Sequence, residues 1–540
     1  MMRNEHPRES RSVRHGTRLS RRAFLQAGIG SVASLLLLAG CERNAAPAPV
    51  NSVDTTFSTD STRESNSLRV GFSAAPAQLD PVTMATTEAF QVAYMVYDSL
   101  VRVDRALMPQ PMLATEWESS TDGLQWIFQL RQDVTFHHGS PFTAADVVHT
   151  LTRLIDPQGG SRLASSLRFI DTVAAVDDST VRLDLNAPNM DLLLLLGTAQ
   201  ARILAADYAP ELLNTQPSGT GPYKVTEILS GDRIRFQRNE AYWDVDQLML
   251  AEVEHRYLPT LDLQAAALAT GELDIIPDVG SSFPDVLSGD PAIATVDVTS
   301  GAYQTVVMQA TEAPFDDVRV RQAIKHCLDR AMLRDHILGG RGVTADDHPV
   351  APVSPFWADL PPQTHDLSRA RALLAEAGYP NGFEIDLITS TSRPGMVELA
   401  QAVQEMVAPV GIRAHVVLVP PDIYWTDYGG KVPFHIGNWN FRPSIDETFR
   451  LAYHSTSTGN ESLWSDPQLD VWIDAARAEP DMAQRKQLYA QAQALIMQDG
   501  AVAIPYFRPI VSAVRTRVQG YQPHPSGLVD LRGVTLQPPS

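Results

Sequence analysis

The apolar run Ala27–Gly40 places the strongest limit on what this chain can fold into. It contains 14 residues, whereas a helix that crosses the ~30 Å hydrocarbon core of a bilayer needs about 20. The run is therefore predicted to be the hydrophobic part of a removable targeting segment rather than a membrane helix. The alternative is a buried N-terminal helix preceded by arginines by chance. On the first interpretation, about 500 residues fold outside the cytoplasm.

Two short motifs flank this run. Ser20–Gln26, which contains Arg21 and Arg22, resembles the bacterial twin-arginine export signal. The tetrapeptide Leu-Ala-Gly-Cys that ends at Cys41 resembles a lipoprotein signal-peptidase site, with the cysteine as the acylated residue. We therefore expect residues 1–41 to be an export signal. The product would be an exported lipoprotein, periplasmic or at the cell surface, held on the membrane by a lipid at Cys41.

The segment after the signal has the composition of a spacer. Residues 42–67 are rich in Ser, Thr, Asn, Ala and Pro and show no apolar period, which is typical of a flexible linker. Leu68–Phe72 is predicted to open the globular part as a short strand. The linker would then hold the globular part at a distance from the membrane.

The charge of the chain excludes some partners. The whole chain carries 43 basic and 63 acidic residues, a formal net charge of −20. The signal removes seven arginines and two acids, so the mature chain keeps 36 basic and 61 acidic residues and a charge of −25. This acidity argues against nucleic acid and anionic lipid as partners, because both require basic patches. Solubility alone would also account for it, and the charge identifies no ligand.

The chain has only 2 cysteines, so core burial rather than disulfide bonding must hold the fold. Cys41 is assigned to the lipid, which leaves Cys327 alone. Apolar residues recur around Cys327 at helical spacing, and this predicts a packed thiol on the buried face of a helix. A nucleophilic or metal-binding role is the weaker alternative.

Short strand patterns alternate with amphipathic helix patterns, which indicates α/β architecture. Val181–Leu185 and Ile234–Phe236 alternate apolar and polar residues, as half-exposed strands do. Asp366–Pro380 contains a cap residue, an apolar stripe, a terminal glycine and a following proline, which together predict a helix. A second helix is predicted over Met482–Met497. Leu192–Leu196 is too short to cross a membrane and is assigned to the core.

Several segments together resemble the bacterial extracellular solute-binding proteins of family 5, which serve ABC importers of peptides, opines and nickel. The resemblance covers roughly residues 68–525, and the segments occur in the order that the family shows. They are Gly123–Val147, Gly219–Lys224, Arg238–Trp243, Val318–Ile324, Asp366–Gly378 and Ile504–Tyr506. Most of these residues are interpreted as structural, for example Thr143 as a helix N-cap.

The resemblance implies a two-lobed periplasmic-binding-protein fold of class II, which closes about a hinge and carries an extra subdomain in the first lobe. The first lobe would comprise 68–105, 219–303 and 506–540, and 106–218 would form the inserted subdomain. The second lobe would be 304–505. Two chain crossings, near 303–309 and 504–507, would form the hinge.

In this architecture the ligand is expected between the lobes, since domain interfaces favour concave sites. By position, the resemblance points to nine residues. They are Met84, Thr86, Thr87, Tyr303, Tyr424, Trp425, Asn438, Trp439 and Arg442. Coverage of the core is the alternative role for the aromatic members of this set.

Arg442 separates this chain from simple peptide binders. Peptide-binding members of the family typically carry an aspartate three residues after the tryptophan that corresponds to Trp439, where it pairs with the peptide ammonium. A guanidinium would repel that ammonium and would match a carboxylate or phosphate instead. Arg442 therefore suggests a ligand with an anionic or acceptor-rich end. Internal pairing with Asp446 or Glu447 is the alternative.

The resemblance implies a non-catalytic, monomeric receptor that passes a small organic solute to ABC permease subunits. No cofactor, resident metal or catalytic residue is predicted. A metal-chelate binder of the nickel type is one alternative, although His415, His435 and His454 lack the close spacing of a metal site. An exported hydrolase is another, but no Gly-x-Ser-x-Gly or His-Glu-x-x-His motif occurs.

Overall fold

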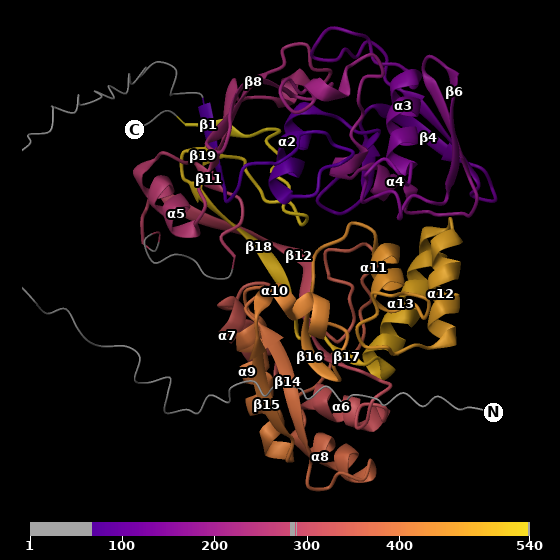
Figure 1. Cartoon of the computed structure of the whole chain (residues 1–540), viewed down its shortest axis with the longest axis vertical. Coiled ribbons are helices and arrows are strands. Elements are labelled where there is room, and N and C mark those ends of the chain that lie inside the picture. Colours follow the sequence, from indigo (N-terminus) through magenta and orange to yellow (C-terminus); the bar gives the residue numbers. More distant parts are fainter. Residues whose placement is uncertain (1–66, 281–286, 288, 538–540) are drawn as a thin grey trace, which may run out of the picture. The chain divides into compact units, whose positions relative to one another are not determined.

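The computed structural model describes residues 67–280, 287 and 289–537 (Figure 1). The predicted export signal with Arg21 and Arg22, the predicted lipidation site Cys41 and most of the predicted linker lie outside these ranges. Their assigned roles therefore stay predictions.

One large mixed sheet runs through the described part of the chain, in the order β15-β14-β16-β12-β18-β11-β1-β10-β9-β8, with β13 paired to β18 and β17 to β12. Its first six strands in chain order are β1 (Ser67–Phe72), β8 (Tyr223–Leu229), β9 (Arg233–Arg238), β10 (Glu252–Tyr257), β11 (Ile275–Ile276) and β12 (Ile293–Met308). The others are β13 (Val343–Thr344), β14 (Glu384–Ser390), β15 (Arg413–Val419), β16 (Phe434–Trp439), β17 (Val502–Ala503) and β18 (Tyr506–Arg515).

Strands β12 and β18 join two lobes. The first half of β12 pairs with β18 and its second half, from Tyr303, pairs with β16. The register with β18 shifts between Thr299 and Tyr303. Figure 1 shows both strands running from an upper group of elements that includes α2 and β8 to a lower group that includes α9 and β14. The predicted two-lobed α/β fold is confirmed, whereas the exact domain ranges and hinge segments stay predictions.

A separate four-stranded antiparallel sheet has the order β4-β5-β7-β6. Its strands are β4 (Ala114–Ser119), β5 (Gln125–Leu130), β6 (Ile170–Asp177) and β7 (Thr180–Leu185). Two small ribbons pair β2 (Val101–Val103) with β3 (Pro109–Pro111) and β19 (Val518–Gln519) with β20 (Thr535–Leu536). The four-stranded sheet lies within the segment 106–218 that the sequence predicts to be an inserted subdomain.

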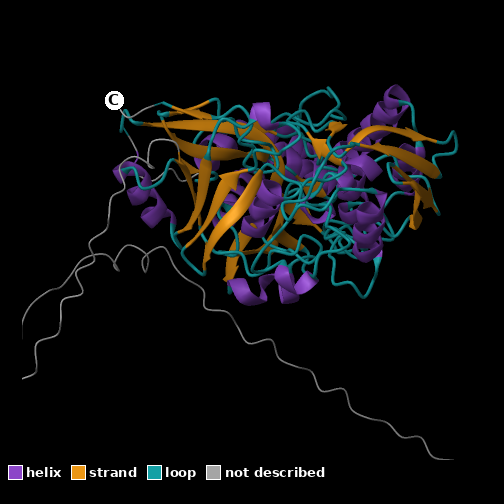
Figure 2. Cartoon of the chain, turned by 90° about the horizontal axis from the view of Figure 1, so that it is seen from above, coloured by secondary structure: helices purple, strands orange, loops and turns teal. Residues whose placement is uncertain are grey.

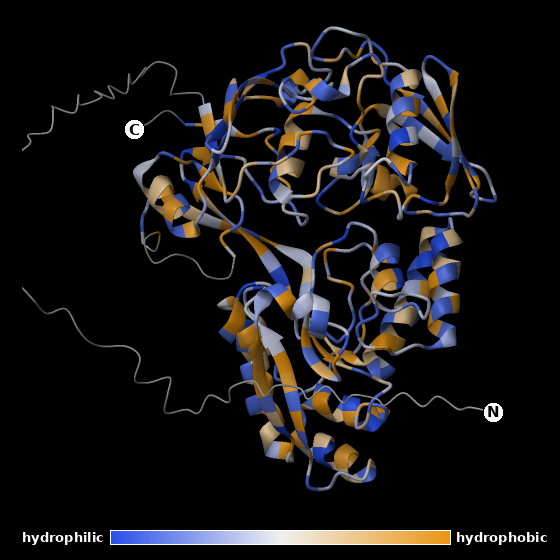
Figure 3. Cartoon of the chain, viewed as in Figure 1, coloured by the Kyte–Doolittle hydropathy of each residue, from blue (hydrophilic) through white to orange (hydrophobic). Residues whose placement is uncertain are grey.

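Helices and strands are interspersed through the described body, as Figure 2 shows. The first six helices are α2 (Thr87–Val96), α3 (Ala144–Ile155), α4 (Leu192–Leu196), α5 (Leu261–Thr270), α6 (Val318–Cys327) and α7 (Arg330–Leu338). The others are α8 (Leu367–Glu376), α9 (Met396–Val407), α10 (Pro421–Ile423), α11 (Ile445–Ala452), α12 (Pro467–Ala478) and α13 (Met482–Asp499). Figure 3 shows hydrophobic and hydrophilic residues mixed along α12 and α13, as expected of helices with one buried face.

Local capping explains where several helices begin. Asp366 precedes α8 and its side chain accepts hydrogen bonds from the backbone N–H groups of Ser368 and Arg369, both at 2.9 Å. Thr143 occupies the N-cap of α3, and its backbone N–H donates to the Asp146 carboxylate at 2.7 Å. The predicted helices over 366–378 and 482–497 are thus present as α8 and α13, with ends shifted by a few residues.

Cys327 is fully buried on α6, as its helical spacing predicts. It packs among apolar residues of α6, α8, α9 and the neighbouring strands. Burial raises the pKa of the Cys327 thiol to about 12. The thiol is therefore a packing group, because the reactive thiolate form is scarce at neutral pH.

Two of the family-like motifs meet at one buried carboxylate, Asp98. Thr220 and Tyr242 donate side-chain hydrogen bonds to it at 3.1 and 3.2 Å, and the indole N–H of Trp243 donates at 3.2 Å. Gly221 must be a glycine, because a Cβ there would come within 2.5 Å of the Val96 backbone. These motif residues position the chain that follows α2 and so shape one wall of the cavity described next.

Candidate functional site

A cavity of about 1060 Å³ lies between the elements that the crossing strands connect. One wall comes from α2, from the segment after β11 and from the C-terminal segment 524–532. The opposite wall comes from the end of α7, from the turn before α9 and from the loop after β16. The size and the two-sided lining are those of a site for a small organic molecule.

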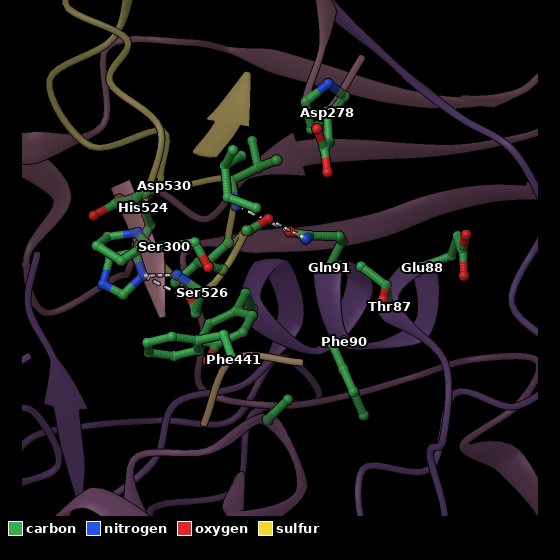
Figure 4. Close-up of a pocket in the computed structure, with 18 of the residues that line it drawn as sticks. Thr87, Glu88, Phe90, Gln91, Asp278, Ser300, Phe441, His524, Ser526 and Asp530 are labelled. Atoms are coloured by element: carbon green, nitrogen blue, oxygen red, sulfur yellow. Dashed lines mark hydrogen bonds between the residues drawn. The ribbon is translucent and has the colours of Figure 1, made fainter. Parts of the chain in front are cut away.

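The cavity offers both aromatic and polar surface. Phe90 and Tyr94 on α2 and Phe441 in the loop after β16 supply aromatic surface. Figure 4 shows Thr87, Glu88, Phe90 and Gln91 on α2 and Asp278 on a separate segment that lines the same cavity. Phe441 packs against Gly301 of β12, where a Cβ would lie 3.1 Å from the ring. The close approach of the loop to β12 therefore depends on that glycine.

Some polar side chains that line the cavity already form hydrogen bonds with other protein groups. The Gln91 side chain donates to the Gly527 carbonyl at 2.9 Å and accepts from the Val529 N–H at 3.0 Å. His524 bonds to Ser526 at 2.7 Å (Figure 4). These contacts fix the C-terminal segment against α2 and leave the groups involved with little capacity for a ligand.

Arg508 is different. It lies on β18, lines the cavity and is partly buried. Within the ranges that the structure describes, its guanidinium has no hydrogen bond and no ion pair, and its Nε is buried without a partner. Burial lowers the pKa of this group below its ordinary value, although an arginine stays charged at any physiological pH.

Asp278 supplies an opposite charge on the same wall. Its carboxylate accepts from the Gly280 N–H at 2.9 Å and stays accessible to solvent inside the cavity. The surrounding protein desolvates it and raises its pKa, while the charge of Arg508 acts in the other direction. Asp278 and Arg508 form no ion pair within 4.0 Å. Sequence reasoning identified neither residue, since nothing in their local patterns marks them.

The three predicted residues near the start of the first lobe take different positions. Met84 is buried in the apolar core. Thr86 is the N-cap of α2 and its hydroxyl accepts from the Ala89 N–H at 3.3 Å. Thr87 lies on the cavity wall (Figure 4). Contact of any of them with a ligand stays a prediction.

Tyr303, Trp439 and Arg442 form a stack at the end of the crossing. The rings of Tyr303 and Trp439 are stacked with centroids 6.5 Å apart, and the Arg442 guanidinium lies 5.5 Å from the Trp439 ring centroid. Tyr303 is buried, whereas the other two are partly exposed. Their neighbours Ala302, Gln304, Asn440, Phe441 and Pro443 line the cavity.

The carboxylates that could neutralise Arg442 internally have other partners. Asp446 lies 3.4 Å from the Arg477 guanidinium, and Glu447 accepts from the Ser166 hydroxyl at 2.8 Å. Burial raises the pKa of Asp446 to about 7. Arg442 makes no ion pair with any residue of the described ranges.

The remaining predicted residues belong to the second lobe. Tyr424 is fully buried and its hydroxyl donates to the Ile436 carbonyl. Trp425 and Asn438 are partly buried, and the Trp425 Nε1 and Asn438 Oδ1 atoms have no partner within the described ranges. Beside them, burial raises the pKa of Glu461 to about 7.

A buried ion pair also joins the two sides of the molecule. Asp191, at the start of α4, pairs with Arg485 of α13 and accepts from the Ser444 hydroxyl at 2.5 Å. Their side chains are only 1% and 7% exposed. The neighbouring Met190 N–H donates to the Arg477 carbonyl at 2.9 Å. These contacts connect the predicted inserted subdomain to the predicted second lobe away from the crossing strands.

The histidines that suggested the metal alternative are held apart. His415 and His435 lie on β15 and β16, which are separated by β14. His435 accepts from the Gly430 N–H at 3.0 Å, and His454 bonds Thr456 at 2.9 Å. Among residues 67–280, 287 and 289–537 there is no group of three or more His, Cys, Asp or Glu side chains placed to hold a metal ion. The same ranges contain no helix long and apolar enough to cross a membrane.

Comparison with known proteins agrees with this geometry. The chain is 27% identical over 565 residues to heme-binding protein A of Haemophilus influenzae, covering 95% of this chain and 99% of that protein. It is 26% identical over 473 residues to the glutathione-binding protein GsiB of Pectobacterium atrosepticum, covering 85% and 92%. The solved structure of HbpA2 from Haemophilus parasuis superposes with a TM-score of 0.79 at 26% identity, covering 87% of this chain and 100% of that chain.

The family assignment rests on the chain itself as well as on these relatives. Residues 108–461, well over half of the chain, match the middle region that defines the bacterial extracellular solute-binding proteins, family 5. This range contains the family-like segment Gly123–Val147 and the Trp439–Arg442 loop. Together with the two-lobed fold and the cavity between the lobes, the match shows that the chain belongs to the bacterial extracellular solute-binding proteins of family 5.

Proposed function

We propose that this protein is the solute receptor of an ABC importer, which captures a small organic, anionic or acceptor-rich solute between its lobes and delivers it to permease subunits. The observation that carries the proposal is the cavity of about 1060 Å³ lined from both sides of the crossing strands. A site divided between two bodies joined by two strands couples binding to closure, because a ligand that contacts both walls favours the closed form.

The chemistry of the cavity supports an anionic ligand group. Arg508 lines the cavity with no hydrogen-bond or ion-pair partner among the described residues, and Arg442 lies beside the cavity with its guanidinium over Trp439. Forked guanidinium donors match carboxylates and phosphates. The named ligands of two relatives, heme and glutathione, both carry carboxylates. The aromatic surface of Phe90, Tyr94 and Phe441 would cover the less polar part of the solute.

The proposal includes location and partners. The protein would be exported through its Arg21-Arg22 signal and anchored by a lipid on Cys41, as a periplasmic or cell-surface monomer. It would act as a receptor without catalytic activity and would not bind nucleic acid. The receptor role is supported by the arginines and aromatic rings of the cavity. An enzyme would instead place a nucleophile next to a general base.

Native mass spectrometry tests the proposal. Protein starting at Glu42 would be recovered from the exported fraction of a host grown in rich medium, and any adduct would be released by denaturation. A stoichiometric organic adduct of a few hundred daltons that carries a carboxylate or phosphate is expected. Ligand-free protein that also binds nothing from a panel of peptides, opines, sugars, glutathione and heme would refute the receptor function.

The anchor needs a separate measurement. Full-length protein from membranes should carry a diacylglycerol on Cys41, visible as a mass increase of the N-terminal peptide, and Cys41→Ala should lack this modification and keep an uncleaved N-terminus. An unmodified Cys41 in the membrane fraction would contradict the lipid assignment. Replacement of Arg21 and Arg22 by lysines should block export, and continued export would contradict the twin-arginine assignment.

A further inference from the structure

The strongest unexplained group in the cavity is Arg508. The buried Nε of Arg508 costs free energy in the ligand-free protein, because this N–H donor loses water without gaining an acceptor among the described residues. No hydrogen bond or ion pair to Arg508 occurs within the described part of the chain. A ligand acceptor in the cavity would remove that cost.

Asp278 lies on the same wall with the complementary charge. Its carboxylate lines the cavity and accepts from the Gly280 N–H at 2.9 Å, with the Val511 backbone as a second hydrogen-bond partner. An ionised carboxylate can accept several hydrogen bonds. It therefore retains capacity for a ligand donor.

Paired strands fix the separation of these two charges. β11 pairs with β18 through Ile275 and Val514, and beyond β11 the Val279 N–H donates to the Val511 carbonyl at 2.7 Å. Asp278 and Arg508 thus belong to one rigid unit. Both side chains line the cavity from this paired unit and form no ion pair within 4.0 Å, so the sheet keeps the two charges on one wall but separate. A fixed gap between opposite charges on one wall is complementary to a ligand that carries both charges close together.

We propose that this wall recognises an α-amino-acid head group, with the ligand ammonium on Asp278 and the ligand carboxylate on Arg508. The inference rests on the proposed receptor function and names its substrate class. Compounds of this class carry the ammonium and the carboxylate on one carbon atom, as free amino acids, γ-glutamyl compounds and amino-acid-derived opines do. The remainder of the ligand would extend along Phe90 and Phe441.

An ordinary peptide would not satisfy the same wall. Its ammonium and carboxylate lie at opposite ends, so a bound N-terminus would place a neutral carbonyl at Arg508 and leave the guanidinium without a charged partner. The proposed site therefore discriminates by the position of two charges and not by net charge. This provides a direct test with isomers.

The test compares two sets of probes by calorimetry with ligand-free protein. Glutathione, γ-glutamylglycine, octopine and glutamine present the head group. The α-linked isomer of glutathione, triglycine and the desamino analogue of the best binder do not. At least one compound of the first set should bind with a dissociation constant below about 1 mM, and glutathione should exceed its α-linked isomer by about tenfold or more if it is the binder.

Variants assign the two roles. Arg508→Gln and Asp278→Asn should each weaken the best binder by about tenfold or more. Asp278→Asn should leave the affinity of the desamino analogue unchanged, a result that a merely structural role would not give. Arg334→Gln, at a partly exposed helix position, and Asp262→Asn, at an exposed one, both lie outside the cavity; they are matched charge controls and should bind as the wild type does. Thermal melts of the ligand-free variants check that they fold.

Each outcome decides the proposal. Wild-type affinity in both variants, or equal affinity for a head-group compound and its desamino analogue, overturns it. So does the absence of binding by every compound of the first set. If the protein then carries a different organic adduct, the receptor function stands and only the head-group inference fails. If no organic solute binds at all, the receptor function fails as well.

Discussion

Replacement of Asp191 by asparagine should shift the protein toward an open form. Asp191 and Arg485 are 1% and 7% exposed and pair across the two sides of the molecule. The variant keeps the shape of the side chain and one acceptor for Ser444, but it leaves the Arg485 charge without its partner. Removing one member of a buried pair costs about 3–5 kcal/mol. We expect the lower end, since Asp446 still acts on Arg485 electrostatically.

The cost applies only when the two sides are in contact, because separation lets water solvate Arg485. A loss of about 3 kcal/mol lowers the closed-to-open ratio by roughly 100-fold. If the ligand binds the closed form, the dissociation constant rises by up to the same factor, with the full effect when the ligand-free wild type is mainly open.

The assay measures the distance between two nitroxide spin labels by electron paramagnetic resonance. Nitroxide labels on Glu118→Cys of β4 and Gln468→Cys of α12, both exposed positions, report the separation of the two sides. The Asp191→Asn variant should show a larger population of long distances than the wild type. Asp335→Asn, which removes an exposed pair with Arg334, is the control. Unchanged distances and unchanged ligand affinity in Asp191→Asn would refute the reasoning.

Three further predictions concern single side chains. Arg442→Ala should lower ligand affinity at least tenfold, or ~1.4 kcal/mol, and unchanged affinity by calorimetry would assign Arg442 a structural role. Burial raises the pKa of Glu461 to about 7, above its ordinary 4.5. The folded wild type therefore binds more protons than the unfolded chain between these values and loses stability as pH rises through this window. The Glu461→Gln variant should gain melting temperature relative to the wild type from pH 5 to pH 8, and a constant difference would contradict the shift. Cys327, with its pKa raised to about 12, should resist thiol reagents until denaturant is added, and rapid labelling of native protein starting at Glu42 would show that the core opens there.

Caps and apolar spacing in the sequence predicted those helices whose formation depends mainly on residues close to one another in the chain. The aspartate cap and terminal glycine of 366–378 determine α8 largely through contacts within a few residues, and the structure confirms that helix. The same holds for the buried face around Cys327 on α6. The α13 pattern was only partly predicted, because its buried face includes Arg485 and Gln493 besides apolar residues. Both are accommodated by distant partners that helical spacing cannot reveal.

The cavity could not be predicted from local patterns for the same reason. Asp278 and Arg508 are separated by more than 200 residues and meet only because β11 pairs with β18. The resemblance to the family pointed to the Trp439–Arg442 loop, and the structure places its neighbours Asn440, Phe441 and Pro443 on the cavity wall. That Arg508 has no partner among the described residues follows from the packing of segments far apart in the chain, which local patterns do not reveal.

Closure around a bound solute can be followed through the distance between labels on Glu118→Cys and Gln468→Cys, measured with and without ligand. The solute released from the purified protein would be removed, the ligand-free distance recorded, and the same solute added back. We expect a shift to one shorter, narrower distance distribution at one equivalent of solute. Identical distributions with and without bound solute would contradict a receptor that works by closing its two lobes.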